Sequence, residues 1–505
     1  MKRVIIAVAS LVLIGSSCTD LDEKLYDGIP ASKYPENESQ ISTIGLDVYN
    51  PIKNFLDNAG WWFAQEVTTD EMVAPTRGTD WDDNGKWRSL QLHTWNNQTE
   101  AVQNMWPNFY NGIVEANKTI ESVTSTDDNA KILIAKFKVI RAYYYYLLID
   151  NYGDVPYITS FKNADKQPFR NKRADVWAKI VSDLKESIPY LKNGGQRYAI
   201  NKGFAQMVLA KLYLNATVYT GTAHWQDCAN VCKEIIDDGY YSLATTVSAP
   251  FVTQNEGCPE NIFTIYYDGD VNKPQFNLHM RTLNYLHNQT FDMTVGPWNG
   301  FATLEDHFNR YEKSDLRKDA YFLYGPQYSS AGKPLLDADA DNKQLDCNPH
   351  IPALQMSIAA GNTPAEIRWS GARVKKYEIA KGAGQSLAND FVLFRLSDTY
   401  LMLAECLVNG ASITGKAAKD FLNPIRERAG LTPIASPTIQ NVRDERTREM
   451  FYEGHRRQDM IRWGLFNTPW WTATSGQFNT SSTANTFPIP KAQSDANPNL
   501  LQAAK

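Results

Sequence analysis

One stretch of the sequence combines aromatic and acidic side chains without a helical or strand-like period. It is PTRGTDWDDNGKW, Pro75–Trp87, which holds two tryptophans, three aspartates and two glycines. Six of the chain's 13 tryptophans lie between Trp61 and Trp106. An indole offers a flat apolar face with one N–H donor, and carboxylates accept hydrogen bonds. This pairing in a loop favours a ligand that has both apolar faces and polar edges.

Trp81 is the strongest candidate in this loop. Asp80 and Asp82 flank it between two glycines, which is a poor position for a core residue. We interpret Trp81 as a stacking surface for a ligand and Asp82 as a hydrogen-bond acceptor; packing of the indole within its own loop is the alternative. The neighbouring tryptophans are expected to pack rather than bind: Trp87, Trp95 and Trp106.

Four further residues are candidates for ligand contact. Trp298 lies in the Gly/Pro loop VGPWNGFAT beside Asn299, and the two form the second predicted platform. Arg373 in SGARVKKYE has the reach to donate to a hydroxyl, with a buried structural ion pair as the alternative. Asp70 in VTTDE is a candidate acceptor, with a helix cap as the alternative.

The sequence contains no catalytic or cofactor signature. It lacks a nucleophile elbow, a Walker loop, a G-x-G-x-x-G motif after a strand and an H-E-x-x-H motif. The carboxylate pairs Asp70–Glu71 and Asp82–Asp83 are adjacent in sequence, whereas a glycosidase needs two carboxyls at a defined spatial separation. The acidic DWDD stretch leaves calcium conceivable. We expect no enzyme activity, no cofactor and no dedicated metal site.

Composition describes a globular protein. Of its 505 residues, 43% are hydrophobic and 12% aromatic, and the formal net charge is -5. There is no dense Lys/Arg block, which argues against a nucleic-acid partner. Six cysteines in a chain of this length do not form a disulfide framework. Cys228 and Cys232 lack a second pair of ligands at metal-site spacing, so we expect them to pack in the core.

The first 17 residues read as a signal peptide. Lys2 and Arg3 precede an apolar run, Val4–Ile14, that is too short to span a bilayer. Small residues follow, and then Cys18. This arrangement resembles a bacterial lipoprotein, in which Cys18 becomes the acylated first residue; ordinary secretory cleavage before it is the alternative. Multiple acyl chains would anchor the protein stably at a membrane.

The mature chain, 18–505, is predicted to be one mainly helical composite domain. Apolar residues recur at helical spacing in several segments, and two of them form a helix pair of the length of one 34-residue helix–turn–helix repeat. The helical scaffold is expected at about 35–240 and 390–465, with a loop-rich insert at about 243–389. Within and beside that insert, NIFTIYYD and FVLFRLS are predicted to be short strands.

Five segments, in order along the chain, resemble the SusD/RagB family of Bacteroidota outer-membrane lipoproteins. The clearest is RDERTREMFYEGHRRQDMIRWG, Arg443–Gly464, which is similar to the family's E-R-x-x-E-L-x-F-E-G-x-R-x-x-D-L-I-R-W-G helix. Departures are Met450 in place of leucine, Gln458 before the aspartate, and Gly15 where the lipobox usually has leucine. The other four segments are APTRGTDWDDNGKWRSLQLHTW, FRLSDTYLMLAECL, LNPIRERAGL and FPIPKAQSDANPNLLQ.

This resemblance implies a fold of four tetratricopeptide-like helix pairs without enzymatic activity. It implies a cell-surface lid that captures oligosaccharide or polysaccharide and delivers it to a SusC-like TonB-dependent transporter of the outer membrane. The acidic TDLDEKL after Cys18 resembles the export signal of surface-exposed lipoproteins, with a solvated tether as the alternative.

The residue chemistry agrees with a saccharide ligand. Sugar rings have an apolar C–H face that tryptophan covers and a polar rim that Asp, Asn and Arg can bind. Two other functions stay open: a RagB-like peptide-binding protein with the same fold and anchor, and a surface glycosidase.

Overall fold

The computed structural model describes residues 46–474 and 476–504. The signal peptide and Cys18 lie outside the described residues, so the lipid anchor stays a prediction. The described chain is mainly helical, as expected. No helix within it is long and apolar enough to cross a membrane.

Helices account for most of the regular structure. Their bounds are α2 (Asn50–Lys53), α3 (Trp61–Glu66), α4 (Lys86–Gln91), α5 (Glu100–Ser122), α6 (Asp128–Tyr152), α7 (Arg173–Ser187), α8 (Lys202–Leu214), α9 (Ala216–Thr220), α10 (Trp225–Asp237), α11 (Leu278–Thr282), α12 (Glu305–Phe308), α13 (Leu316–Tyr321), α14 (Pro364–Trp369), α15 (Leu396–Val408), α16 (Lys419–Arg428), α17 (Ile439–Glu449), α18 (Arg456–Arg462) and α19 (Lys491–Ala496).

The strands are short and pair two by two. The pairs are β1 (Met72–Val73) with β4 (Ala302–Thr303), β2 (Thr76–Arg77) with β10 (Gln355–Met356), β3 (Asn261–Ile265) with β12 (Phe391–Arg395), β5 (Phe322–Leu323) with β11 (Arg373–Val374), β6 (Gly325–Pro326) with β9 (Asp346–Cys347), and β7 (Leu336–Asp337) with β8 (Lys343–Gln344). Among the strand pairs in the described part of the chain, β2 and β10 alone run parallel. The two strands predicted from the sequence are β3 and β12, and they pair with each other.

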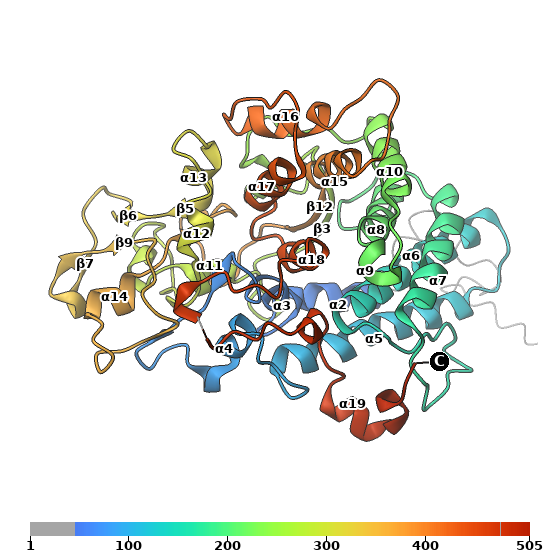
Figure 1. Cartoon of the computed structure of the whole chain (residues 1–505), viewed down its shortest axis with the longest axis horizontal. Helices are drawn as coiled ribbons and strands as arrows, with labels where there is room; N and C mark the ends of the chain where they lie inside the picture. The colour runs from blue at the N-terminus through green and yellow to red at the C-terminus, as the bar shows by residue number, and fades with distance from the viewer. Residues whose placement is uncertain (1–45, 475, 505) are drawn as a thin grey trace, which may run out of the picture.

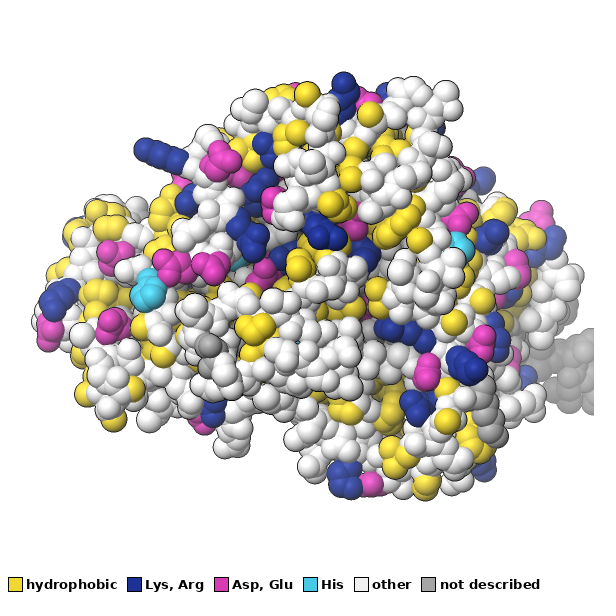
Figure 2. All heavy atoms as spheres, in the orientation of Figure 1, with side chains coloured by type: hydrophobic (Ala, Val, Ile, Leu, Met, Phe, Trp, Pro, Cys, Tyr) yellow, Lys and Arg dark blue, Asp and Glu magenta, His cyan; other side chains and the backbone are white. Residues whose placement is uncertain are grey.

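The long helices and the loop-rich segments occupy opposite halves of the molecule (Figure 1). In the helical half, α5 packs on α6, α6 on α7, α8 on α10, and α10 on α15. The α8–α10 contact is the predicted helix pair. In the other half, α11–α14 and the pairs β5–β11 to β7–β8 hold the insert together. Lysines, arginines and acidic residues are interspersed over the face seen in Figure 2, without a broad patch of one sign.

The apolar residues of the predicted helices face inward. Three helix ends carry glycines in the left-handed region, as expected: Gly410, Gly430 and Gly464. The buried thiols of Cys228 and Cys232 pack between α8, α10 and α15, which confirms their assignment to the core. Within residues 46–474 and 476–504, no cluster of three or more His, Cys, Asp or Glu side chains could hold a metal ion.

The segment Arg443–Gly464, expected to be one helix, is two. Its first part belongs to α17 and its last part to α18, and the chain turns between them. Tyr452 has φ 71° and Gly454 has φ 78°, and a positive φ is unfavourable for tyrosine. A Cβ at position 454 would lie 2.4 Å from the Trp61 ring. Tertiary packing therefore overrides the helical pattern here.

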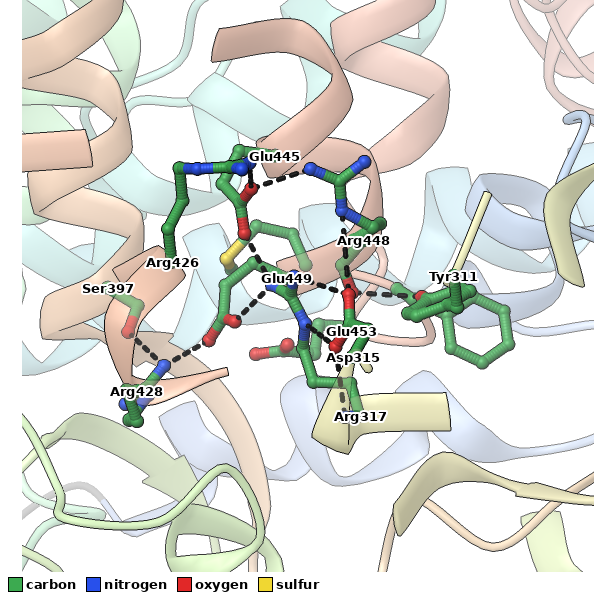
Figure 3. Close-up of polar contacts among 12 residues, drawn as sticks. Tyr311, Asp315, Arg317, Ser397, Arg426, Arg428, Glu445, Arg448, Glu449 and Glu453 are labelled. Carbon is green, nitrogen blue, oxygen red and sulfur yellow. Dashed lines mark hydrogen bonds and ion pairs between the residues drawn. The ribbon is translucent and has the colours of Figure 1, made fainter. Parts of the chain in front are cut away.

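Three charged side chains of α17 are buried in the protein: Glu445, Arg446 and Glu449. Arg448 contacts Glu445 at 2.6 Å, and Asp444 lies 4.0 Å from Arg310, so the i, i+4 pair that the helical spacing of Asp444 and Arg448 predicts is not formed. We call the buried cluster around α17 the charge network (Figure 3). Its members are Glu260, Asp315, Arg317, Arg395, Arg428, Glu445, Glu449 and Glu453, with side chains at most 5% exposed.

Arg395 and Arg317 hold the charge network together. Arg395 lies 2.7–2.8 Å from carboxylate oxygens of Glu260, Glu449 and Glu453. Arg317 lies 2.9 Å from Glu449. Burial alone would raise the pKa of Glu449, but the surrounding arginines hold it well below its usual value. Glu449 therefore stays charged, and its arginine partners belong to the protein itself.

Candidate functional site

The loop that follows β2 begins with a tight turn. The backbone N–H of Arg77 donates to the carbonyl of Asp80 at 2.9 Å, and that of Asp80 donates back to Arg77 at 3.2 Å. Gly78 has φ 71°, which glycine adopts without strain. The turn exposes Asp80 and points the chain towards Trp81.

Trp81 lies across a second loop that is distant in sequence. Its Nε1–H donates to the carbonyl of Trp298 at 2.9 Å. Its ring lies against the backbone of Gly300, where a Cβ atom would come within 2.2 Å of the indole. The edge of the ring meets Phe301, with centroids 5.2 Å apart. Trp81 is partly exposed, so these contacts hold the indole while solvent still reaches part of the residue.

Trp298, predicted separately, is thus brought to Trp81. Its backbone N–H donates to Met280 at 2.6 Å, and the guanidinium of Arg281 lies 5.3 Å from its ring centroid. A cation above an aromatic face is attractive, which holds the ring in place. Trp298 also stays partly exposed. The structure therefore brings the two loops that carry the predicted aromatic platforms together through a side chain–backbone hydrogen bond.

Tyr285 is a third aromatic residue beside the Trp81 loop, and it was not among the residues predicted from the sequence. It begins the 3₁₀ turn Tyr285–Asn288, and its hydroxyl donates to Asp80 Oδ2 at 2.6 Å. The guanidinium of Arg368 lies 5.1 Å from its ring centroid. Burial and the nearby Asp80 carboxylate raise the pKa of Tyr285 to about 12. No local pattern marks Tyr285, because Asp80 is 205 residues away.

Asp82 is the acidic candidate that remains accessible. Its carboxylate pairs with Arg88 of α4, and its side chain is 44% exposed. The adjacent Asp83 accepts from Trp87 Nε1 at 2.6 Å. Trp87 itself is buried, as is Trp106, while Trp95 is partly exposed and packs 4.8 Å from Phe487. We call the partly exposed set the aromatic surface: Asp80, Trp81, Asp82, Tyr285 and Trp298.

Two of the predicted ligand contacts lie beneath this surface instead. Asn299 is buried, with its Oδ1 accepting from Arg373 Nη2 at 2.8 Å and its Nδ2 donating to the Arg368 carbonyl at 3.0 Å. Arg373 is fully buried. Burial lowers its pKa, and its hydrogen bonds go to an amide and a carbonyl rather than to a carboxylate. Both residues support the loop that carries Trp298.

Arg77 performs a similar supporting role. It is buried, and its three nitrogens donate to the carbonyls of Gly300, Ile367 and Ser370 at 2.8–3.2 Å. This arginine ties the Trp81 loop to the Trp298 loop and to the end of α14. Carbonyl partners satisfy its donors without a second buried charge.

Asp70 is placed in an ion pair rather than on the aromatic surface. Arg456 of α18 contacts both of its carboxylate oxygens at 2.6 and 2.7 Å, and Arg310 approaches at 3.3 Å. Burial alone would raise the pKa of Asp70, but the two arginines lower it to about 2. The alternative of a helix cap is therefore wrong, and both carboxylate oxygens of this predicted acceptor already contact arginine.

The fold and the aromatic surface define a class of protein: a helical scaffold that presents an aromatic, hydrogen-bonding surface on loops. A sequence model of the SusD family matches residues 259–505, and one described as "Starch-binding associating with outer membrane" matches residues 34–214. The chain belongs to the SusD/RagB family. The glycan-binding proteins of this family are non-catalytic.

Two curated relatives show the extent of the similarity. The Starch-binding protein SusD of Bacteroides thetaiotaomicron is 24% identical over 86% of this chain and 83% of its own length. The SusD-like protein P25 of Formosa agariphila is 26% identical over 80% of this chain and 79% of its own length.

Solved structures show the same fold. Surface glycan-binding protein A from Bacteroides thetaiotaomicron, in complex with laminarihexaose, has a TM-score of 0.73 at 21% identity, covering 91% of this chain and 97% of that one. Surface glycan-binding protein A from Bacteroides uniformis has a TM-score of 0.72 at 20% identity, with coverage of 92% and 99%.

Proposed function

We propose that this protein captures an oligosaccharide or polysaccharide outside the cell and delivers it to a SusC-like TonB-dependent transporter, without catalysing a reaction. Acylated Cys18 would hold it at the outer membrane with the aromatic surface exposed. The relatives named above support this function: one is a starch-binding protein, and one structural neighbour is a complex with laminarihexaose.

The joining of Trp81 to Trp298 is the observation that carries the proposal. The Trp81 indole donates a hydrogen bond to the backbone carbonyl of Trp298, 217 residues away in sequence, and both tryptophans are partly exposed. Asp80 and Asp82 lie beside them as acceptors for hydroxyl groups. Aromatic stacking with a polar rim is the chemistry that holds a sugar ring and still permits release.

The test is a binding screen of the mature protein against starch, laminarin, laminarihexaose and other glycans. Affinity gels and calorimetry should detect at least one ligand, and Trp81→Ala and Trp298→Ala should each weaken its binding. Loss of one central aromatic anchor typically costs about 2 kcal/mol or more, which corresponds to roughly 30-fold in Kd.

Trp225→Ala is the matched control, because Trp225 is a partly exposed tryptophan on α10 in the helical half. It should bind as wild type does. A protein that binds peptides and no glycan, or Trp81 and Trp298 variants with unchanged affinity, would contradict the proposal. A Cys18→Ala variant that remains in the membrane fraction would contradict the lipid anchor.

A further inference from the structure

A small pocket, which we call the Trp471 hollow, lies in the loop-rich half of the protein, apart from the aromatic surface. Its volume is 310 Å³, and Trp470 and Trp471 line one part of it, with Glu305, Asp306 and His350 among the other lining residues. Ligand pockets in proteins measure about 300–1,000 Å³. The hollow lies at the lower end of this range, so it has room for a short portion of a chain-like ligand.

The two tryptophans of the hollow are held differently. Trp470 packs among other rings, with its centroid 5.3 Å from that of His93 and 4.7 Å from that of Phe478. Trp471 packs on the small apolar cluster that contains Leu304 and Ile351, and no ring contact is formed by it within the described residues. The partly exposed Trp471 indole is thus the one with a face available for stacking.

Acidic groups provide the polar edge of the hollow. Asp306 is exposed and forms no ion pair within residues 46–474 and 476–504. Glu305 Oε2 lies 2.7 Å from His350 Nδ1, and the side chains of Glu305 and His350 are 43% and 62% exposed. The lining also includes Asp70, whose charge Arg456 neutralises.

The acidic lining of the hollow favours uncharged saccharides over anionic ones. Among the described residues that line the hollow, none is a lysine or an arginine. Carboxylates accept hydrogen bonds from sugar hydroxyls, but they repel uronic-acid or sulfate groups because like charges at close range are unfavourable. The chemistry of the hollow therefore fits a neutral sugar.

The chain connects the hollow to the aromatic surface. Trp298 and Glu305 are separated by seven residue steps that include β4, so their Cα atoms are at most roughly 25 Å apart. Backbone bonds keep this segment fixed: Thr303 N–H donates to Ala372, and Leu304 N–H donates to Glu71, both at 3.0 Å. The two regions therefore have a defined spacing.

We propose that the Trp471 hollow is a second saccharide-binding site, for a neutral sugar unit that stacks on Trp471 and whose hydroxyl groups donate hydrogen bonds to Asp306 and Glu305. The site rests on the proposed glycan-binding function. It adds contacts for a longer polysaccharide, which raises affinity because the second contact is intramolecular once the first has formed.

The experiment compares wild type, Trp471→Ala, Asp306→Asn and Trp298→Ala in affinity gels that contain starch or laminarin, with polygalacturonate as the anionic glycan. Trp471→Ala should weaken retention by the bound neutral polysaccharide about 10-fold, and Asp306→Asn about 3-fold. No variant should gain or lose binding to polygalacturonate. Thermal unfolding of each variant shows whether it folds; Asp306→Asn alters an exposed side chain and provides the test if Trp471→Ala does not fold.

Asp341→Asn is the matched control for Asp306→Asn, since Asp341 is also an exposed carboxylate of the loop-rich half. If Trp471→Ala and Asp306→Asn bind as wild type does while Trp298→Ala loses affinity, the hollow is not a site and the proposed function stands. If the wild type binds no neutral glycan, the proposed function and this site both fail. Binding of polygalacturonate that depends on Trp471 would also overturn the neutral-sugar assignment.

Discussion

Carboxylates and arginines gather in two regions of this molecule, the charge network beside α17 and the aromatic surface after β2. In the charge network each carboxylate is buried and meets an arginine within the protein. On the aromatic surface, Asp80 and Asp82 each hold one neighbour and remain accessible. The family's most recognisable sequence motif therefore belongs to the scaffold. The residues proposed to bind the ligand lie in loops that have no such distinctive motif.

The largest expected effect comes from breaking the charge network. Arg395→Leu leaves Glu260, Glu449 and Glu453 without their shared cation, and loss of one partner of a buried pair costs about 3–5 kcal/mol. Denaturant unfolding should show this loss. Lys491→Met, which removes an exposed pair with Asp495, should change the midpoint little. An Arg395 variant of unchanged stability would show that the network contributes nothing.

The next effect depends on pH and concerns Glu66, at the edge of the network. Burial raises its pKa from 4.5 to about 7, against the lowering effect of a 2.6 Å hydrogen bond from the Gly454 N–H. A raised folded-state pKa gives a stabilising contribution that is full below about pH 4.5 and is lost as pH rises through about 7. Glu66→Gln should therefore raise the unfolding midpoint above pH 7 and change it little near pH 4.5. Equal shifts at both pH values would contradict this.

A smaller effect tests the geometry of the aromatic surface. Gly300→Ala places a methyl group 2.2 Å from the Trp81 indole, so the ring must move, at a cost of about 1–3 kcal/mol. Glycan affinity should fall with stability. Gly296→Ala is the control in the same loop, because nothing lies within 4 Å of its added Cβ. Gly300→Ala with normal affinity would show that the position of Trp81 does not matter.

The smallest effect isolates one hydrogen bond. Tyr285→Phe removes the bond to Asp80, worth about 1 kcal/mol, and should weaken glycan binding a few-fold by calorimetry without unfolding the protein. Tyr324→Phe removes a matching 2.6 Å bond to Asp319 elsewhere and should leave binding unchanged. Equal effects of the two variants would remove Tyr285 from the aromatic surface.

Sequence patterns predicted the scaffold well because helical periodicity is local. The helices around residues 128–152 and 202–237 and the strands β3 and β12 followed from apolar spacing alone. The break between α17 and α18 did not, because Tyr452 is held in a left-handed conformation by packing that no local rule encodes.

The candidate site was only partly predictable for the same reason. Trp81 and Trp298 were recognisable from their loop surroundings. The sequence could not show whether Asp70 binds a ligand or forms an ion pair, because its partner Arg456 is 386 residues away. Residue type shows which bonds a side chain can make, and the fold decides whether a protein group or a ligand makes them.

The bond between Trp81 and Trp298 has a consequence for biogenesis. Because it spans 217 residues, the Trp81 indole reaches the Trp298 backbone only after the two loops have come together, and contacts of such long range are slow to form. A chain in which these two loops have not come together would therefore lack the aromatic surface.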